Sequence, residues 1–477
     1  MSASSSPALL KRVRPQVLRP LHPAYAGTAP EMPLPTLRLA DARWPRPFAG
    51  GIEYSPPARG PWTIVHIGML MPEMHEIFVC AQACLRGVVL SAAEMNVQDR
   101  FSTITVTEEH FRDGRLEEAI IEGTEKILSE LPRQPRAVLL YTSCVHHFTG
   151  ADIDWALKVL RRRFAEIEFI DAYMTPTFRK TEMPPDNKMR LQLYQGLKPA
   201  ASPRGGVLLA GTLEPFGPRS AFARLAAAAG VPFYELAGLT RYDDYLQMAN
   251  ARIAVTINPA AKQAGESLRD RLGMTWLSLP LSYDEAEIEQ GLAALAQALG
   301  LTWGPDSAAA ERARAAAALE AARQALDGRP VAICQTATTR PAGLALRLAQ
   351  AGIRVTDLFA DSFLPGDKPA FDALRTLAPD IRVHPTTTPE MRFAPRRTAS
   401  GADEGLVAIG QKAAWFTGAS HMVNLIEGGP LWGHSGVAAL AERLAAAARH
   451  PADVMKIIRI KGYGCLGGEC QSEEGWI

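Results

Sequence analysis

The sequence lacks an excess of charge of either sign. Its 477 residues include 51 Lys and Arg against 50 Asp and Glu, a formal net charge of +1. A chain this close to neutral has no strong field with which to recruit nucleic acid or an anionic membrane surface. It also lacks any apolar run near the roughly 18 residues that a membrane-spanning helix needs. We therefore expect a globular protein that binds neither nucleic acid nor membrane.

Cysteine is scarce, with six in the whole chain. Six are too few for a disulfide scaffold in a protein of this size, and they favour metal or redox chemistry in a reducing, cytoplasmic compartment. The sequence also contains no G-x-x-x-x-G-K-[S/T] phosphate-binding loop. If the system hydrolyses ATP, another polypeptide has to do it.

From about residue 61 the chain alternates between short apolar segments typical of strands and longer segments typical of helices. Strands are expected at 63–70, 102–109, 136–144 and 166–174, with the pattern restarting within 205–280 and within 329–426. This alternation predicts an α/β fold of three Rossmann-like domains, whose parallel sheets carry helices on both faces. The expected units are an N-terminal arm (1–60), a domain with candidate ligands (61–204), a second domain (205–304), a third domain (305–450) and a C-terminal tail (451–477).

Two helices have recognisable caps. Residues 114–131 are amphipathic and follow Asp113, a candidate N-cap. The Ala-rich stretch 307–328 is a strong helix former, with Asp306 or Ser307 as its cap.

The first 60 residues are dense in proline, and the first 30 are basic and without an acidic side chain. A transit peptide has a similar composition. The prolines fit an extended segment better, so we expect a surface arm that wraps around a neighbour.

Three cysteines lie in the first third of the chain, among apolar residues. Residues 74–95 read as a helix or a loop running into one, which would place Cys80 and Cys84 on one face. Cys144 ends a predicted strand, where open α/β sheets bind ligands. Thiolates so placed could share an iron–sulfur cluster or zinc, although free cysteines are also common as small buried apolar residues. Three are too few for a closed four-thiolate site, which suggests a cluster shared with another chain.

Other candidate ligands carry less weight. His146 and His147 follow Cys144, so a Cys-x-His zinc site is conceivable, but neighbouring histidines at a strand exit point in opposite directions and one should cap or pack. Cys334 lies within a predicted strand and is expected to be a core thiol. Cys465 and Cys470 are expected to be a tail thiol pair, with a ligand or redox role as the alternative.

Two glycine-rich segments resemble nucleotide-binding loops. Residues 462–467 form a G-x-G-x-x-G, but this motif needs a following helix and strand, and only ten residues of the sequence follow it. We reject it. Residues 428–436, GGPLWGHSG, precede an apolar helix and could cradle an anion, although a tight turn explains them equally well.

Read together, the segments from the first cysteine pair to residue 154 resemble component 1 of the nitrogenase superfamily. In that superfamily a Thr-Glu…Phe-x-Gly segment precedes a strand ending in Thr-x-Cys, followed shortly by Gly-Asp. The matching residues here are Cys84, Thr107, Glu108, Phe111, Gly114, Thr142, Cys144, Gly150 and, one residue later than usual, Asp152. The resemblance extends over roughly residues 60–450.

The resemblance implies a subunit of an α₂β₂ complex. Three thiolates from each of two related chains would hold an iron–sulfur cluster, an [8Fe-7S] P-cluster type, at their interface. Cys84 and Cys144 match two family ligands. Cys80 is the only candidate for the third, although the family places that cysteine much further upstream.

A second departure concerns the catalytic cofactor, which the α-like chain of the family holds with a Cys in the second domain and a His in the third. This chain has no cysteine between Cys144 and Cys334, and the matching second-domain stretch reads VTINPAAK. His421 and His434 lie near the third-domain position, but without the Cys they form half a site. The chain therefore resembles the β-like partner, which receives electrons from an ATP-hydrolysing iron protein and carries no catalytic cofactor.

Within the superfamily, the sequences of the two cysteine segments are most similar to those of methylthio-alkane reductases. Those enzymes cleave a carbon–sulfur bond reductively and release a thiol and a hydrocarbon. Three alternatives stay open: a cofactor-assembly scaffold, a dinitrogenase β subunit, and a structural half with inert thiols.

Overall fold

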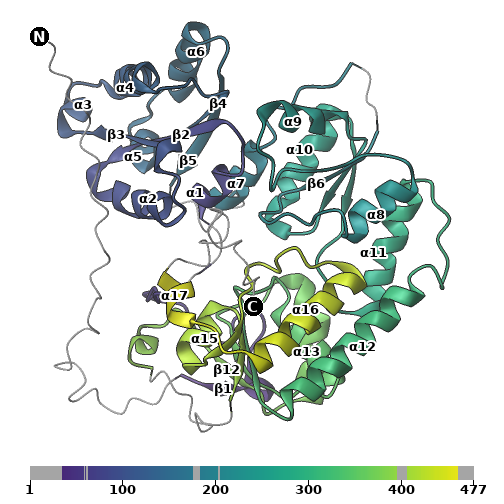
Figure 1. Cartoon of the computed structure of the whole chain (residues 1–477). Helices are drawn as coiled ribbons and strands as arrows, with labels where there is room; N and C mark the ends of the chain where they lie inside the picture. The colour runs from purple at the N-terminus through teal and green to yellow at the C-terminus, as the bar shows by residue number, and fades with distance from the viewer. Residues whose placement is uncertain are drawn as a thin grey trace, which may run out of the picture.

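The computed structural model describes residues 35–58, 60, 63–175, 183–201, 205–394 and 405–459. They form three lobes, each built around one sheet (Figure 1). The first lobe lies in the purple and blue part of the chain and the second in the teal part, while the third lies in the green and yellow part together with the purple strand at Leu37–Arg38. The described helices include none long and apolar enough to cross a membrane.

The first sheet is parallel throughout and carries the candidate cysteines. Its strands are β2 (Met74–Ala81), β3 (Phe101–Val106), β4 (Ala137–Ser143) and β5 (Glu168–Met174), in the spatial order β3-β2-β4-β5. One face packs on α4 (Leu116–Glu130) and α6 (Ile153–Arg163), and the other on α1 (Ile64–Gly68), α2 (Gln82–Glu94) and α7 (Pro185–Gln192). All seven residues of β4 are buried, as expected for a central strand covered on both faces.

Two sequence predictions in this lobe are wrong. Residues 63–70, predicted as a strand, instead contain the short helix α1, whose N-cap Thr63 hydrogen bonds from its backbone N to His66 Nδ1 at 3.0 Å. The strand is the next apolar run, β2, although the sequence predicts a helix, or a loop running into one, from residue 74. A short apolar run fits either structure by periodicity alone. In β2 the residues alternate faces, so that Phe78 and Cys80 join one core and Ile77 the other.

The second sheet is also parallel. Its strands are β6 (Val207–Ala210), β7 (Phe233–Glu235), β8 (Ile253–Thr256) and β9 (Thr275–Ser278), in the order β7-β6-β8-β9. The helices of this part of the chain are α8 (Ala221–Ala228), α9 (Tyr242–Gln247), α10 (Lys262–Leu272) and α11 (Glu285–Ala298).

The third sheet has six strands in the order β1-β12-β11-β10-β13-β14. They are β1 (Leu37–Arg38), β10 (Val331–Cys334), β11 (Val355–Phe359), β12 (Arg382–His384), β13 (Val407–Ile409) and β14 (His421–Val423), parallel except for β1. The accompanying helices are α12 (Ala309–Leu326), α13 (Pro341–Gln350), α14 (Lys368–Leu377), α15 (Gln411–Thr417), α16 (Gly433–Arg449) and α17 (Val454–Arg459). Each predicted domain range contains one parallel sheet, and the exact boundaries stay a prediction.

The two predicted helices form, but their predicted caps do not. Asp113 instead ends α3 (Glu108–Arg112), and α4 begins after Arg115. The Ala-rich helix α12 begins after Ala308. Ser307 lies two residues before the helix, where its hydroxyl accepts a hydrogen bond from the backbone N–H of Gly304. The Asp113 carboxylate instead accepts a hydrogen bond from Arg112 Nε at 3.1 Å, so both polar side chains have other local partners.

Within residues 35–58, the described part of the predicted arm packs on its own chain, and contact of the arm with a neighbouring chain stays a prediction. β1 pairs antiparallel with β12. Leu39 is fully buried, and Trp44 packs against Phe363 and Phe371 with ring centroids 6.0 and 5.4 Å apart. This apolar burial anchors the arm to the third lobe.

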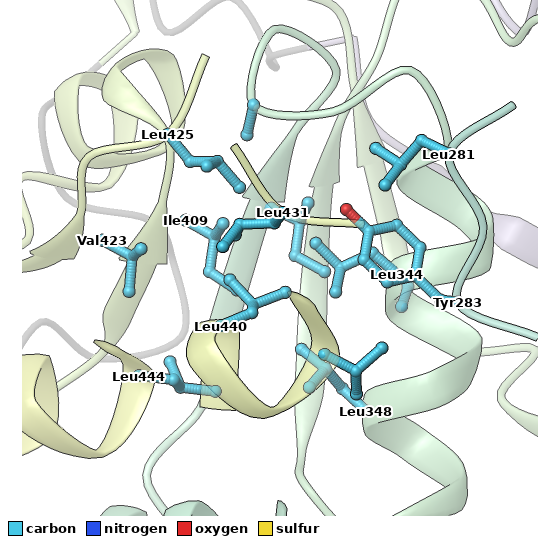
Figure 2. Packing of buried hydrophobic residues seen from close by; sticks show 14 of the residues in the cluster. Leu281, Tyr283, Leu344, Leu348, Ile409, Val423, Leu425, Leu431, Leu440 and Leu444 are labelled. Atoms are coloured by element: carbon cyan, nitrogen blue, oxygen red, sulfur yellow. The ribbon is translucent and has the colours of Figure 1, made fainter. Parts of the chain in front are cut away.

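One apolar core joins the second and third lobes. Figure 2 shows Leu281 and Tyr283, which follow β9, among side chains of the third lobe such as Leu344 and Leu431. Tyr283 also donates a hydrogen bond to Thr338 at 2.9 Å. The two lobes therefore share buried surface rather than only a linker.

Candidate thiol site

The cysteines lie at the topological switch point of the first sheet. From β2 the chain crosses to β3 on one side, and the later strand β4 lies on the other side, so the connections diverge after neighbouring strands. Ligands in open α/β sheets bind outside the carboxyl ends of the strands at such a point. Cys80 is the seventh of eight residues in β2, and Cys144 directly follows β4.

The sequence predicts that Cys80 and Cys84 share one helix face, but in the structure they do not. Cys80 is in β2, where it pairs with Thr105, and it is fully buried. Cys84 is the third residue of α2 and is exposed. The chain turns from strand to helix at Ala81, so the two thiols lie on either side of one turn.

Cys144 is the first residue of α5 (Cys144–Thr149) and is partly exposed. Its position next to Cys80 follows from the register, because Phe78 pairs with Tyr141 and their rings stack at 4.0 Å. β2 and β4 thus end side by side, and the sheet itself brings Cys80 and Cys144 to one edge.

Electrostatics also couple the three thiols. Burial, and to a smaller extent the negative charges of Cys84 and Cys144, raise the pKa of Cys80 to about 12. Three thiolates together at this edge would repel one another. A bound metal centre would offset that repulsion, because metal coordination deprotonates thiols.

The histidines after Cys144 have other roles in this structure. The backbone N of Ser143 donates to His146 Nδ1 at 3.2 Å, which caps α5, and burial lowers the pKa of His146 to about 4. Its Nε2 is buried and has no hydrogen-bond partner among the described residues. His147 packs edge-to-face on Tyr173. The prediction that one histidine would cap or pack is confirmed, although they lie in a helix rather than at a strand exit.

The thiol site is open rather than closed. Across the described ranges, no group of three or more His, Cys, Asp or Glu side chains is arranged to hold a metal ion. The helices that carry Cys84 and Cys144 also expose large apolar side chains, with Leu90 at 51% and Phe148 at 75% exposure. Thiol donors at an exposed, apolar edge fit an iron–sulfur cluster completed by another chain. Cys84 and Cys144 fit this arrangement best, because Cys80 is already enclosed by its own core.

The remaining sequence candidates are structural where the model describes them. Cys334 is fully buried in β10, with Sγ 3.1 Å from Thr336 Oγ1, which confirms a core thiol. His421 Nδ1 contacts the Ala447 carbonyl oxygen at 2.7 Å, and His434 Nε2 contacts Glu289 at 2.8 Å. Cys465, Cys470 and residues 462–467 lie outside the described residues.

A polar junction between lobes was missed by sequence reasoning. Arg190 of α7 is almost fully buried and donates from Nη2 to Glu427 Oε2 at 2.5 Å. Asn258, just after β8, donates to the same oxygen at 2.9 Å. Beside this junction lies a cavity of about 30 Å³, whose lining includes Glu214. No local sequence signal marks such a pairing of residues more than 160 positions apart.

Comparison with known proteins agrees with this architecture. A family model described as "Nitrogenase component 1 type Oxidoreductase" matches residues 63–449. A solved structure titled "Nitrogenase Cp1 at pH 6.5" superposes with a TM-score of 0.63 at 14% identity, covering 84% of this chain and 94% of that one. Another, "Nitrogenase Cp1 at pH 5", gives 0.54 at 11% identity, with coverages of 84% and 90%. At these identities the likeness shows the fold alone.

No curated protein matched the sequence. The family assignment therefore rests on the family model, which spans most of the chain and includes all three thiols of the candidate site. The parallel sheets flanked by helices agree with it. This chain belongs to the nitrogenase component 1 type oxidoreductase family.

Proposed function

We propose that this chain is the β-like subunit of a nitrogenase-like reductase and holds half of an iron–sulfur cluster shared with an α-like partner. The observation that carries the proposal is the gathering of Cys80, Cys84 and Cys144 at one open sheet edge. In this proposal the partner chain supplies the remaining ligands, because these three thiols do not form a closed site by themselves. When bound, a cluster of the [8Fe-7S] type supplies one-electron transfer between an ATP-hydrolysing iron protein and a catalytic cofactor.

In this proposal the residues of this chain hold and insulate the cluster. Cys84 and Cys144 ligate through their accessible thiolates, and Cys80 closes the inner side. His146 stays neutral, since burial lowers its pKa to about 4, and adds no charge beside the thiolates. Burial and hydrogen bonding around the sulfurs would set the reduction potential.

In the second sheet the connections diverge between β6 and β8, and this second switch point supports the assignment to the β-like subunit. The stretch that matches the cofactor-binding segment of the α-like chain contains Asn258, which here hydrogen bonds Glu427 instead of presenting a thiol. The adjoining cavity is small, at about 30 Å³. A catalytic cofactor is accordingly assigned to the partner, in an α₂β₂ assembly.

The proposed reaction is reductive carbon–sulfur cleavage of methylthio-alkanes, and it rests on the resemblance of the two cysteine segments. The test is anaerobic co-expression of this chain with its α-like partner and its iron protein. We expect ATP-dependent release of a thiol and a hydrocarbon from ethyl methyl sulfide or dimethyl sulfide. Reduction of dinitrogen instead would assign a dinitrogenase subunit, and a cluster-loaded complex without turnover would assign an assembly scaffold.

A further inference from the structure

Cys144 lies at the start of a helix whose first turn is closed by one histidine side chain. Ser143, the last residue of β4, is the N-cap of α5, and Cys144 is the first helical residue. The backbone N–H of Ser143 donates to His146 Nδ1 at 3.2 Å, and the Ser143 hydroxyl lies 3.4 Å from the same nitrogen. Cys144 is therefore inside the turn that the His146 ring closes.

The same cap occurs a second time at the carboxyl edge of the first sheet. At the start of α3, the backbone N of Thr107 donates to His110 Nδ1 at 3.0 Å. The helix that carries Cys84 differs, because α2 begins after Ala81, whose side chain has no polar group with which to cap it. Of the two accessible thiols, Cys144 is thus the one whose backbone is fixed by a side-chain cap.

Histidine is an unusual choice at this position. The common partner in such a cap is Glu or Gln, three residues after the N-cap. A glutamate in place of His146 would bring negative charge close to Cys144 and oppose its thiolate, whereas a neutral imidazole supplies the acceptor without that charge. Because Nδ1 accepts, the ring proton is on Nε2.

This arrangement costs stability. His146 is 1% exposed, and its Nε2 has no hydrogen-bond partner within the described ranges. A buried donor without an acceptor is unfavourable, and such groups are expected at functional sites rather than in an ordinary core.

We infer that His146 is a positioning residue for the shared iron–sulfur cluster, which fixes the start of α5 and so holds the Cys144 thiol ready for the metal. The inference rests on the proposed function, because it concerns the same cluster. Nδ1 is occupied and Nε2 is enclosed by protein, so His146 acts through the Ser143 backbone and not as a ligand. Hydrogen bonds that orient a metal ligand in this way commonly govern how tightly the metal is held.

The first measurement uses the metal-free full chain, labelled with iodoacetamide and followed by peptide mass spectrometry. His146→Leu removes the acceptor for the Ser143 N–H, and Cys144 should be alkylated about fivefold faster, the factor by which loss of a cap typically shifts a local opening equilibrium. Cys84 in the same sample is the internal control and should keep its rate. His146→Gln supplies the common capping partner and should return Cys144 to the wild-type rate.

The second measurement is the electron paramagnetic resonance spectrum of the anaerobically purified complex and its rate of iron loss to a chelator. His146→Leu should alter the spectrum and lose iron roughly tenfold faster, and His146→Gln should match the wild type. His110→Leu is the matched control, since it removes the equivalent cap from α3, which carries none of the three thiols. It should keep the wild-type spectrum and rate.

The two measurements separate this inference from the proposed function. A wild-type complex without iron would overturn the proposed function, while the labelling rates would still decide whether His146 fixes Cys144. Equal labelling of Cys144 in the wild type and His146→Leu would overturn the inference. So would an iron-loaded His146→Leu complex whose spectrum and rate of iron loss are those of the wild type.

Discussion

Arg190 Nη2 and Glu427 Oε2 are 2.5 Å apart although 237 residues separate them in the sequence. Arg190 lies in helix α7, which packs on the first sheet, and Glu427 precedes α16 in the third lobe. Asn258 of the second lobe donates to the same carboxylate. The buried Arg190–Glu427 ion pair and its hydrogen bond from Asn258 therefore connect all three lobes. They lie beside the small cavity in which, under the proposed function, no catalytic cofactor binds.

Removing Arg190 should destabilise the protein strongly. Arg190→Met leaves the carboxylate of Glu427 without its guanidinium partner, and breaking a buried pair on one side costs about 3–5 kcal/mol. The measurement is the free energy of unfolding from denaturant titration. The exposed pair Arg314–Glu442 is the control, because Arg314→Met should cost less than about 1 kcal/mol. The double variant Arg190→Met/Glu427→Gln should recover part of the loss; no recovery would show that the two residues are not coupled.

Glu76 should be a neutral acid in the folded protein. It is fully buried in β2, and burial raises its pKa well above the usual value, against the smaller effects of Arg100 and Tyr141. Tyr141 Oη donates to the Ile64 carbonyl oxygen at 3.1 Å and lies 3.4 Å from Glu76 Oε1. A phenol has one proton, so the second contact is best satisfied by a proton on Glu76.

The pH dependence of stability follows from this raised pKa. The unfolded chain ionises Glu76 above about pH 4.5, whereas the folded chain keeps the proton, so the contribution of Glu76 is fully present below that pH and falls as pH rises. Glu76→Gln should remove this decline and be at least as stable as the wild type at pH 7. The comparison is unfolding free energy between pH 5 and 8, with Glu442→Gln as a surface control. An unchanged slope in Glu76→Gln would show that the carboxyl is ionised in both states.

Thiol reactivity should rank the three candidate ligands in the metal-free chain. Cys84 is exposed, Cys144 is partly exposed and Cys80 is buried with a pKa of about 12. Because the thiolate is the nucleophile, iodoacetamide should alkylate Cys84 fastest and Cys80 slowest. Peptide mass spectrometry over time gives the order. Fast labelling of Cys80 would mean that the end of β2 is open in solution, and Cys334 should stay unlabelled as an internal control.

The pattern of alternating elements could be predicted from the sequence because each strand carries its own signal. The run 136–144 is apolar on both faces, and 114–131 has a clear helical period, and both form as expected. The run 63–70 is as apolar as a strand, yet it contains a helix. The pair Thr63 and His66 was the available signal, since Thr is a good N-cap and the structure places His66 three residues later against the Thr63 backbone.

The residues of the candidate site could be predicted from the sequence, but their arrangement in space could not. Cys144 at a strand end was located correctly. The positions of Cys80 and Cys84 depended on where β2 ends and α2 begins, and element boundaries are weakly encoded in local sequence. The Arg190–Glu427 pair was not predictable at all, because nothing near either residue identifies a partner in another lobe.

The central claim is that Cys84 and Cys144 hold iron together with a partner chain. Its most direct test is the iron content and the electron paramagnetic resonance spectrum of the anaerobically purified complex, for wild type, Cys84→Ala/Cys144→Ala and Cys334→Ala. The account predicts that the double variant loses the shared cluster and its spectrum while the complex still folds, and that Cys334→Ala retains both. Full iron and an unchanged spectrum in Cys84→Ala/Cys144→Ala would contradict the account.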